Sequence, residues 1–193
     1  MQQIYRLWQS FATPAVGLAC VSGLAVPALA AQPEQEALIQ DALSAAPPAV
    51  ASTAAVMDWD HKILKQGSGP YTCMPSDPDT RAKGDRDPMC VDQVWMAWAE
   101  AYMDKKPFKA DRGGIAYMLA GESSSNIDPY ASGPTANNQW VVEGPHIMVL
   151  LPDPAELEGI STDPNSGGAY VMWKGTPYAH IMVPVAARPP QKQ

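Results

Sequence analysis

A short pattern that could bind a soft metal occurs twice in the sequence. His-Ile-Met-Val is found at 146–149 and again at 180–183. Because side chains on a strand alternate between its two faces, each histidine would share a face with the methionine two positions later. Imidazole and thioether groups suit Cu(I). If the two strands are neighbours, a candidate copper site therefore consists of His146, His180, Met148 and Met182.

Ordinary core packing is the alternative for these four residues. Methionine is a common filler of irregular cores, and a buried histidine is often satisfied by a backbone carbonyl. The methionines also lie further apart in sequence than in Met-rich copper motifs. Apart from copper, the sequence indicates no cofactor.

A long polar loop over 121–138 is the second candidate site. It contains three consecutive serines, and Ser125, Asn126 and Asp128 are its candidate ligand contacts, because long polar loops on a rigid scaffold often bind ligands. A hydrolase built on 123–128 is an alternative, with His146 or His180 as the base. The sequence has no Gly-x-Ser-x-Gly element to support it. A solvated loop without a site is the plainer interpretation.

Motifs for phosphate loops, dinucleotide binding, zinc and EF-hand calcium are missing from the sequence. Charged residues make up only 17% of the chain, and there are three histidines. This leaves few groups for acid–base catalysis and argues against an enzyme. The leading prediction is a module that binds a small ligand or a partner, or that has a structural role.

The cysteines predict one disulfide. Cys73 and Cys90 remain if a leader containing Cys20 is removed, and an even number of cysteines in an oxidising compartment favours pairing. Closing a loop of about 16 residues contributes roughly 3 kcal/mol in the chain-entropy model. A reactive thiol at Cys90, in the first turn of a helix, is the alternative, although Cys-x-x-Cys spacing is absent.

One long amphipathic helix is predicted over 88–104. Asp87 is a suitable N-cap and Pro88 suits the first helical position. An apolar stripe follows at helical spacing, formed by Val91, Val94, Trp95, Trp98 and Tyr102. A shorter helix is expected at 33–46, within a segment, 31–52, that ends in an Ala/Pro linker.

The remaining elements are predominantly strands. Extended segments are predicted at 53–58, 62–66, 71–74, 115–120, 140–142, 146–151, 169–173 and 178–185. Strands on both sides of one dominant helix indicate an α+β fold: an antiparallel sheet with helix 88–104 packed on one face, and one disulfide. A single globular domain is expected over 53–185, followed by a Pro-rich disordered tail at 186–193.

The first thirty residues have the layout of a secretory signal. A segment with Arg6 as its only charged side chain precedes an uncharged apolar run over 11–26, and Ala28-Leu29-Ala30 predicts cleavage between Ala30 and Ala31. Prolines and glycines interrupt the run, which argues against a membrane anchor, and Cys20 lacks a good lipoprotein context. We therefore expect a periplasmic or secreted protein.

The mature chain is predicted to be acidic. Removing Arg6 from a chain of formal charge −7 leaves −8. Such a charge repels phosphate backbones and anionic lipid surfaces, so nucleic acid is not expected as a partner. No second apolar stretch is long enough to insert into a membrane after signal cleavage.

Several distinctive segments resemble a group of exported bacterial proteins known only as hypothetical. They are Tyr-Thr-Cys-Met-Pro at 71–75, Asp-Pro-Met-Cys at 87–90, Ile-Ala-Tyr-Met-Leu-Ala-Gly at 115–121 and Trp-Lys-Gly-Thr-Pro-Tyr at 173–178. The resemblance covers roughly 53–185. It implies no established activity and no catalytic residue. At His61 the chain departs from the group, where glycine is more usual.

Overall fold

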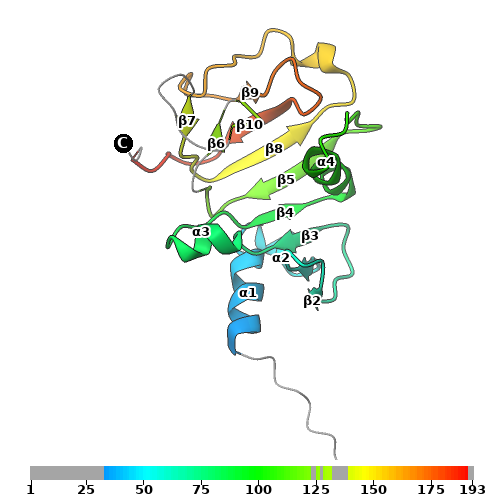
Figure 1. Ribbon diagram of the computed structural model, residues 1–193, viewed down its shortest axis with the longest axis vertical. Helices are drawn as coiled ribbons and strands as arrows, with labels where there is room; N and C mark the ends of the chain where they lie inside the picture. The colour runs from blue at the N-terminus through cyan, green and yellow to red at the C-terminus, as the bar shows by residue number, and fades with distance from the viewer. Residues whose placement is uncertain (1–32, 123–124, 127, 132–138, 191–193) are drawn as a thin grey trace, which may run out of the picture. The chain divides into compact units, whose positions relative to one another are not determined.

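A mixed sheet of eight strands forms the framework of the chain (Figure 1). The computed structural model describes residues 33–122, 125–126, 128–131 and 139–190. The sheet order is β2-β1-β3-β4-β5-β8-β10-β9. Its strands are β1 (Ala55–Met57), β2 (Ile63–Lys65), β3 (Thr72–Met74), β4 (Met89–Val91), β5 (Gly114–Met118), β8 (His146–Leu150), β9 (Tyr170–Met172) and β10 (His180–Pro184).

The main sheet is mostly antiparallel, as the sequence predicted. Its one parallel pair joins β1 to β3, and its other neighbouring strands run antiparallel. Every predicted extended segment contains or overlaps a strand. A separate two-stranded ribbon pairs β6 (Ser125–Asn126) with β7 (Trp140–Val141).

The predicted helix 88–104 is wrong at its start. The helix is α4 (Gln93–Met103), and its N-cap is Asp92, whose carboxylate accepts the N–H groups of Val94 and Trp95 at 2.9 Å each. Residues 89–91 form β4 instead, because they pair with β3 on one side and β5 on the other. Cys90 therefore lies on a strand, and its predicted place in a helical turn is also wrong.

The disulfide prediction is confirmed. Cys73 on β3 and Cys90 on β4 are directly opposite each other in the ladder, and their Sγ atoms are 2.08 Å apart. Both residues are fully buried. The bond therefore joins two central strands of the sheet and closes the loop that carries α3 (Pro78–Ala82).

Short helices precede the sheet in the chain. They are α1 (Pro33–Leu43) and α2 (Pro48–Ala51), the second of which lies in the segment predicted as a linker. Ala42 and Ala45 are fully buried, and they belong to the same cluster as the disulfide. Among the residues that the structure describes, no helix combines the length and the apolar character needed to span a bilayer.

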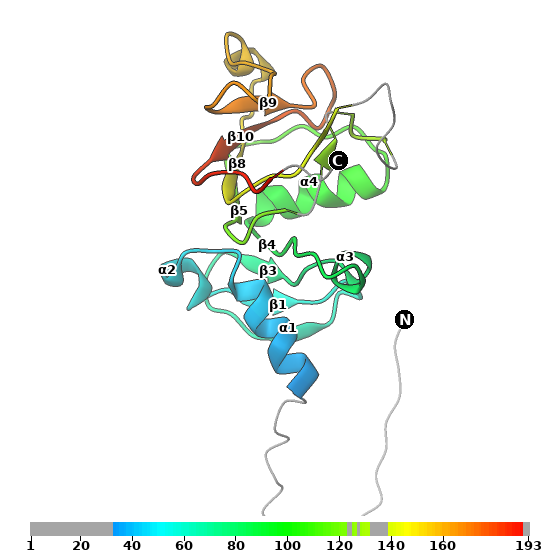
Figure 2. The same cartoon turned by 90° about the vertical axis from the view of Figure 1, so that its left-hand side faces the viewer.

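The two faces of the sheet carry different side chains. Cys73 and Cys90 share a cluster with Ile39 of α1. Val91, the residue after Cys90, points to the other face and clusters with Trp95 and other residues of α4. In Figure 2, α1 lies by β1 and β3, whereas α4 lies by β5. The two helices therefore contact opposite faces.

A glycine allows α4 to approach the sheet closely. A Cβ atom at Gly114 would lie 2.9 Å from the Cβ of Val94 and 3.2 Å from the ring of Trp95. Because real Cβ atoms do not come so near to another carbon, any larger residue at 114 would push α4 away from β5.

Candidate ligand pocket

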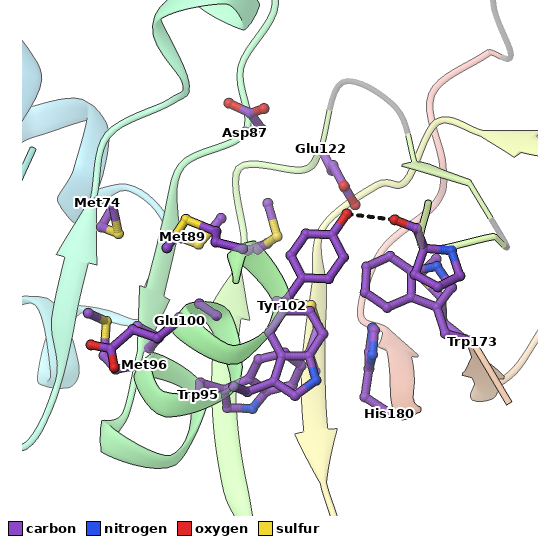
Figure 3. A pocket seen from close by; sticks show the side chains of 18 of the residues that line it. Met74, Asp87, Met89, Trp95, Met96, Glu100, Tyr102, Glu122, Trp173 and His180 are labelled. Atoms are coloured by element: carbon purple, nitrogen blue, oxygen red, sulfur yellow. Dashed lines mark hydrogen bonds between the residues drawn. The ribbon is translucent and has the colours of Figure 1, made fainter. Parts of the chain in front are cut away.

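A cavity of about 390 Å³ lies beside α4 on the face of the sheet opposite the disulfide (Figure 3). Nine of the chain's ten methionines and five of its six tryptophans line it; Met1 and Trp8, in the predicted leader, are the exceptions. These residues are Met57, Met74, Met89, Met96, Met103, Met118, Met148, Met172, Met182, Trp59, Trp95, Trp98, Trp140 and Trp173. We call the cavity the Met/Trp pocket.

Strand register explains how methionines far apart in the sequence meet. Met74 is opposite Met89, and Met148 is opposite Met182. Cross-strand partners project from the same face of a sheet, and so do residues two positions apart on one strand. Seven methionines, from β1, β3, β4, β5, β8, β9 and β10, consequently face the pocket. The other two, Met96 and Met103, come from α4.

Three aromatic rings from two parts of the chain lie almost parallel at one end of the pocket. Trp98 and Tyr102 come from α4, and Trp173 follows β9; their ring centroids are 5.3 to 5.6 Å apart, with interplanar angles of 7° to 17°. Trp173 has a φ of 57°, which is uncommon for a bulky residue. Backbone strain of this kind persists only where surrounding contacts hold it in place, and the aromatic stack supplies such contacts.

His180 lies against this aromatic group and lines the pocket. Its ring centroid is 5.2 to 5.5 Å from those of Trp95, Trp98 and Trp173, with each pair close to perpendicular. Its Nδ1 is 2.9 Å from the carbonyl oxygen of Tyr178. A carbonyl can only accept, so Nδ1 carries the proton and Nε2 keeps a free electron pair. Burial lowers the pKa of His180 to about 4, which keeps the ring neutral.

His146 lies elsewhere. It is fully buried on β8, its Nδ1 is 2.7 Å from the carbonyl oxygen of Gly144, and its Nε2 has no partner in the described parts of the chain. Burial also lowers its pKa. His146 is opposite Pro184, at the other end of β10 from His180. The two histidines are thus offset by four positions along neighbouring strands, and His146 does not line the pocket.

The four residues of the predicted copper site are therefore only partly brought together. Strands β8 and β10 are neighbours, as that hypothesis requires, and Met148 lies directly opposite Met182. His180 and both methionines line the pocket, whereas His146 does not. No cluster of three or more His, Cys, Asp or Glu that could hold a metal occurs among the described residues.

The polar groups of the pocket are acidic. Asp87, Glu100, Glu122 and Asp128 line it, and none of the described lining residues is Lys or Arg. Burial of its carboxyl raises the pKa of Glu122 to about 8, and the charges of Glu143 and Asp87 add to this effect. Among the described lining residues, the pocket therefore offers no lysine or arginine to an anionic ligand.

A buried ion pair lies next to Glu122, and the sequence analysis missed it. Glu143 is buried, and its carboxylate accepts two hydrogen bonds from Arg188 at 2.8 Å each and a third from the hydroxyl of Tyr170. Arg188 lies in the segment predicted as a disordered tail. The pairing joins residues 45 positions apart, so no local pattern signals it.

The predicted polar-loop site lies largely outside the described residues. Ser123 and Ser124 are not described, and Ser125 and Asn126 contribute their backbones to β6. Asp128 is exposed, accepts the N–H of Tyr130 at 2.9 Å and lines the pocket. The hydrolase hypothesis for 123–128 remains a prediction.

No known protein family, curated protein or solved structure matches this chain significantly.

Proposed function

We propose that this protein is an exported binding module whose site is the Met/Trp pocket. The observation that carries the proposal is the convergence of nine methionines and five tryptophans on one cavity. Methionine is flexible and polarizable and is used on surfaces that adapt to ligands, while tryptophan offers a large rigid contact area. A volume of about 390 Å³ is within the usual range for small-molecule sites, roughly 300 to 1,000 Å³.

Plain core packing accounts less well for this arrangement. Protein interiors have few voids larger than a water molecule, whereas this cavity is far larger. The ligand is apolar or soft and polarizable, because the lining is mainly thioether and indole. It is not an anion, because its polar contacts would include acidic side chains such as Asp87 and Glu100.

Two further predictions belong to this proposal. The disulfide between Cys73 and Cys90 supports a periplasmic or secreted location, since disulfides persist in oxidising compartments. The finding that Trp95 and Trp98 of α4 cluster with Val91 of β4 supports the role of α4 as the dominant helix on the methionine face. That helix then acts as a wall of the ligand site.

Binding of a neutral fluorescent naphthylamine to the chain 31–193 tests the proposal. Ala99 of α4 lines the pocket, while Ala97 on the same helix is exposed. Ala99→Phe fills the cavity and should weaken probe binding by about tenfold or more, equivalent to roughly 1.4 kcal/mol. Ala97→Phe adds the same side chain outside the pocket and should leave affinity within about twofold.

Two results would overturn the proposal. One is the absence of saturable probe binding by the wild-type protein. The other is an equal loss of affinity in Ala99→Phe and Ala97→Phe while both variants keep the wild-type circular dichroism spectrum.

A further inference from the structure

The imidazole of His180 is arranged like a metal ligand. It is 2% exposed and lines the Met/Trp pocket, and its Nδ1 proton is directed to the carbonyl oxygen of Tyr178. Histidines that bind metals almost always donate their other N–H to a carbonyl or carboxylate, which fixes the ring and its tautomer. With the proton on Nδ1, Nε2 of His180 carries the electron pair of the ring and can donate it to a metal.

Methionines from three strands lie on the same face of the sheet as this imidazole. Met172 is directly opposite His180 on β9, and Met182 is two residues along β10. Met182 in turn is opposite Met148 on β8. Cross-strand partners have Cβ atoms about 4.5 to 5.5 Å apart, a span that flexible methionine side chains can close around one ion. Met172 and Met182 are 3% and 1% exposed.

The donor atoms at this end of the pocket determine which metal ion it would bind. One neutral imidazole and neutral thioethers are soft donors that favour Cu(I), whereas Mg²⁺ and Ca²⁺ require oxygen ligands. Trp95, Trp98 and Trp173 pack around His180. Indole rings interact favourably with cations and exclude the water that would otherwise compete for the ion.

We propose that the Met/Trp pocket binds one cuprous ion at its β9–β10 end, through His180 Nε2 and the sulfurs of Met172, Met182 and Met148. This proposal rests on the proposed function of the pocket and specifies its ligand. It differs from the four-residue site expected from sequence, since His146 is replaced by Met172. Binding forms dative bonds only, with no change in the oxidation state of copper and no proton released from His180.

Anaerobic titration of the chain 31–193 with Cu(I), against a chromophoric Cu(I) chelator, tests the site. The wild-type protein should remove one equivalent of Cu(I) from the chelator. His180→Asn should weaken Cu(I) binding by about a hundredfold, and the volume-conserving double variant Met172→Leu/Met182→Leu by a similar factor, which corresponds to about 2.7 kcal/mol. X-ray absorption of the loaded protein should show both nitrogen and sulfur ligands.

A matched control lies on strands β8 and β10 themselves. Ile147 and Ile181 alternate with Met148 and Met182, so they project from the other face of the sheet, and they do not line the pocket. The volume-conserving double variant Ile147→Leu/Ile181→Leu should leave Cu(I) affinity within about threefold of wild type. If His180→Asn does not fold, the Met172→Leu/Met182→Leu variant decides the question, because leucine keeps the apolar volume.

The copper proposal is overturned if the wild-type protein takes no copper from the chelator, or if the Met172→Leu/Met182→Leu variant binds Cu(I) as tightly as Ile147→Leu/Ile181→Leu. The same preparations are titrated with the naphthylamine probe. If the wild-type protein binds the probe but not copper, the copper proposal is rejected, and the proposal that the pocket binds ligands is retained. If the wild-type protein binds neither copper nor the probe, both proposals are rejected.

Discussion

At the residue scale, Glu122 has an unusual electrostatic position. Its carboxyl is buried near the carboxylates of Glu143 and Asp87, and Glu143 accepts a hydrogen bond from the phenol of Tyr170. These neighbours offer Glu122 no positive charge, because Arg188 is already paired with Glu143. The carboxyl is consequently held in its neutral form at neutral pH.

We expect the stability of the protein to fall as the pH rises through the range of this group. Glu122 has a pKa of about 8 when folded and an ordinary value of 4.5, so the folded state binds the extra proton between these values. Its contribution to the free energy of unfolding is complete below pH 4.5 and is lost by about pH 8. Glu122→Gln removes this dependence.

Thermal melts at pH 5, 6.5 and 8.5 measure the effect. The difference in Tm between Glu122→Gln and wild type should grow with pH, whereas Glu156→Gln, at an exposed site, should give a constant difference. A Tm difference for Glu122→Gln that does not change with pH would contradict the assignment of a raised pKa.

Sequence reasoning worked for individual residues where the signal was local. The repeated His-Ile-Met-Val pattern identified two strands, and the structure shows that they are neighbours with Met148 opposite Met182. It did not identify Met172, whose relation to His180 depends on the placement of β9. The pairing of Arg188 with Glu143 was equally hidden, because partners so distant in sequence meet only in the folded sheet.

At the element scale, Asp92 joins α4 to the sheet. One carboxylate oxygen caps the helix at Val94 and Trp95, and the other accepts the N–H of Ile115 on β5 at 2.7 Å. Asp92→Ala should lower the free energy of unfolding by about 2 kcal/mol, because it removes an N-cap and leaves the N–H of Ile115 without its partner.

Urea denaturation of three proteins checks this expectation. Asp104→Ala is the matched control, since Asp104 is exposed at the other end of α4 and its carboxylate pairs with the exposed Lys106. It should change stability by less than about 0.5 kcal/mol. Equal effects of the two substitutions would show that the bonds of Asp92 contribute no special stability.

The misplaced start of α4 shows why element boundaries escape local patterns. Asp77-Pro78 and Asp87-Pro88 carry the same helix-start signal, but only the first begins a helix, α3. At the second, Asp87 instead accepts the N–H of Asp77 and the hydroxyl of Thr80. The apolar run at 89–91 suits a helix or a strand, and its two strand partners decide the outcome.

At the scale of the whole molecule, the disulfide and the pocket occupy opposite faces of one sheet. The double variant Cys73→Ala/Cys90→Ala should therefore lose about 2 to 5 kcal/mol of stability and keep its affinity for the naphthylamine probe within about twofold. Urea unfolding and probe titration of the same sample measure both quantities. A large loss of probe affinity in protein that remains folded would show that the two faces are coupled.

The general class of the fold followed from the sequence, but its assembly did not. Turn residues and alternation identified the strands. The order of strands, the parallel pairing of β1 with β3, and the contact of α1 with the disulfide face all depend on long-range packing. The pocket was hidden for the same reason, since its methionines come from seven strands and one helix.

Gathering almost every thioether around one cavity makes that cavity chemically vulnerable. Oxidants convert methionine to a polar, chiral sulfoxide. Oxidation of a few of these methionines would make the apolar lining polar and would remove its soft thioether groups. The Cys73–Cys90 bond, on the other face of the sheet, is already oxidised. Oxidative damage would thus remove the affinity of the pocket for apolar and soft ligands, and enzymatic reduction of the sulfoxides would restore it.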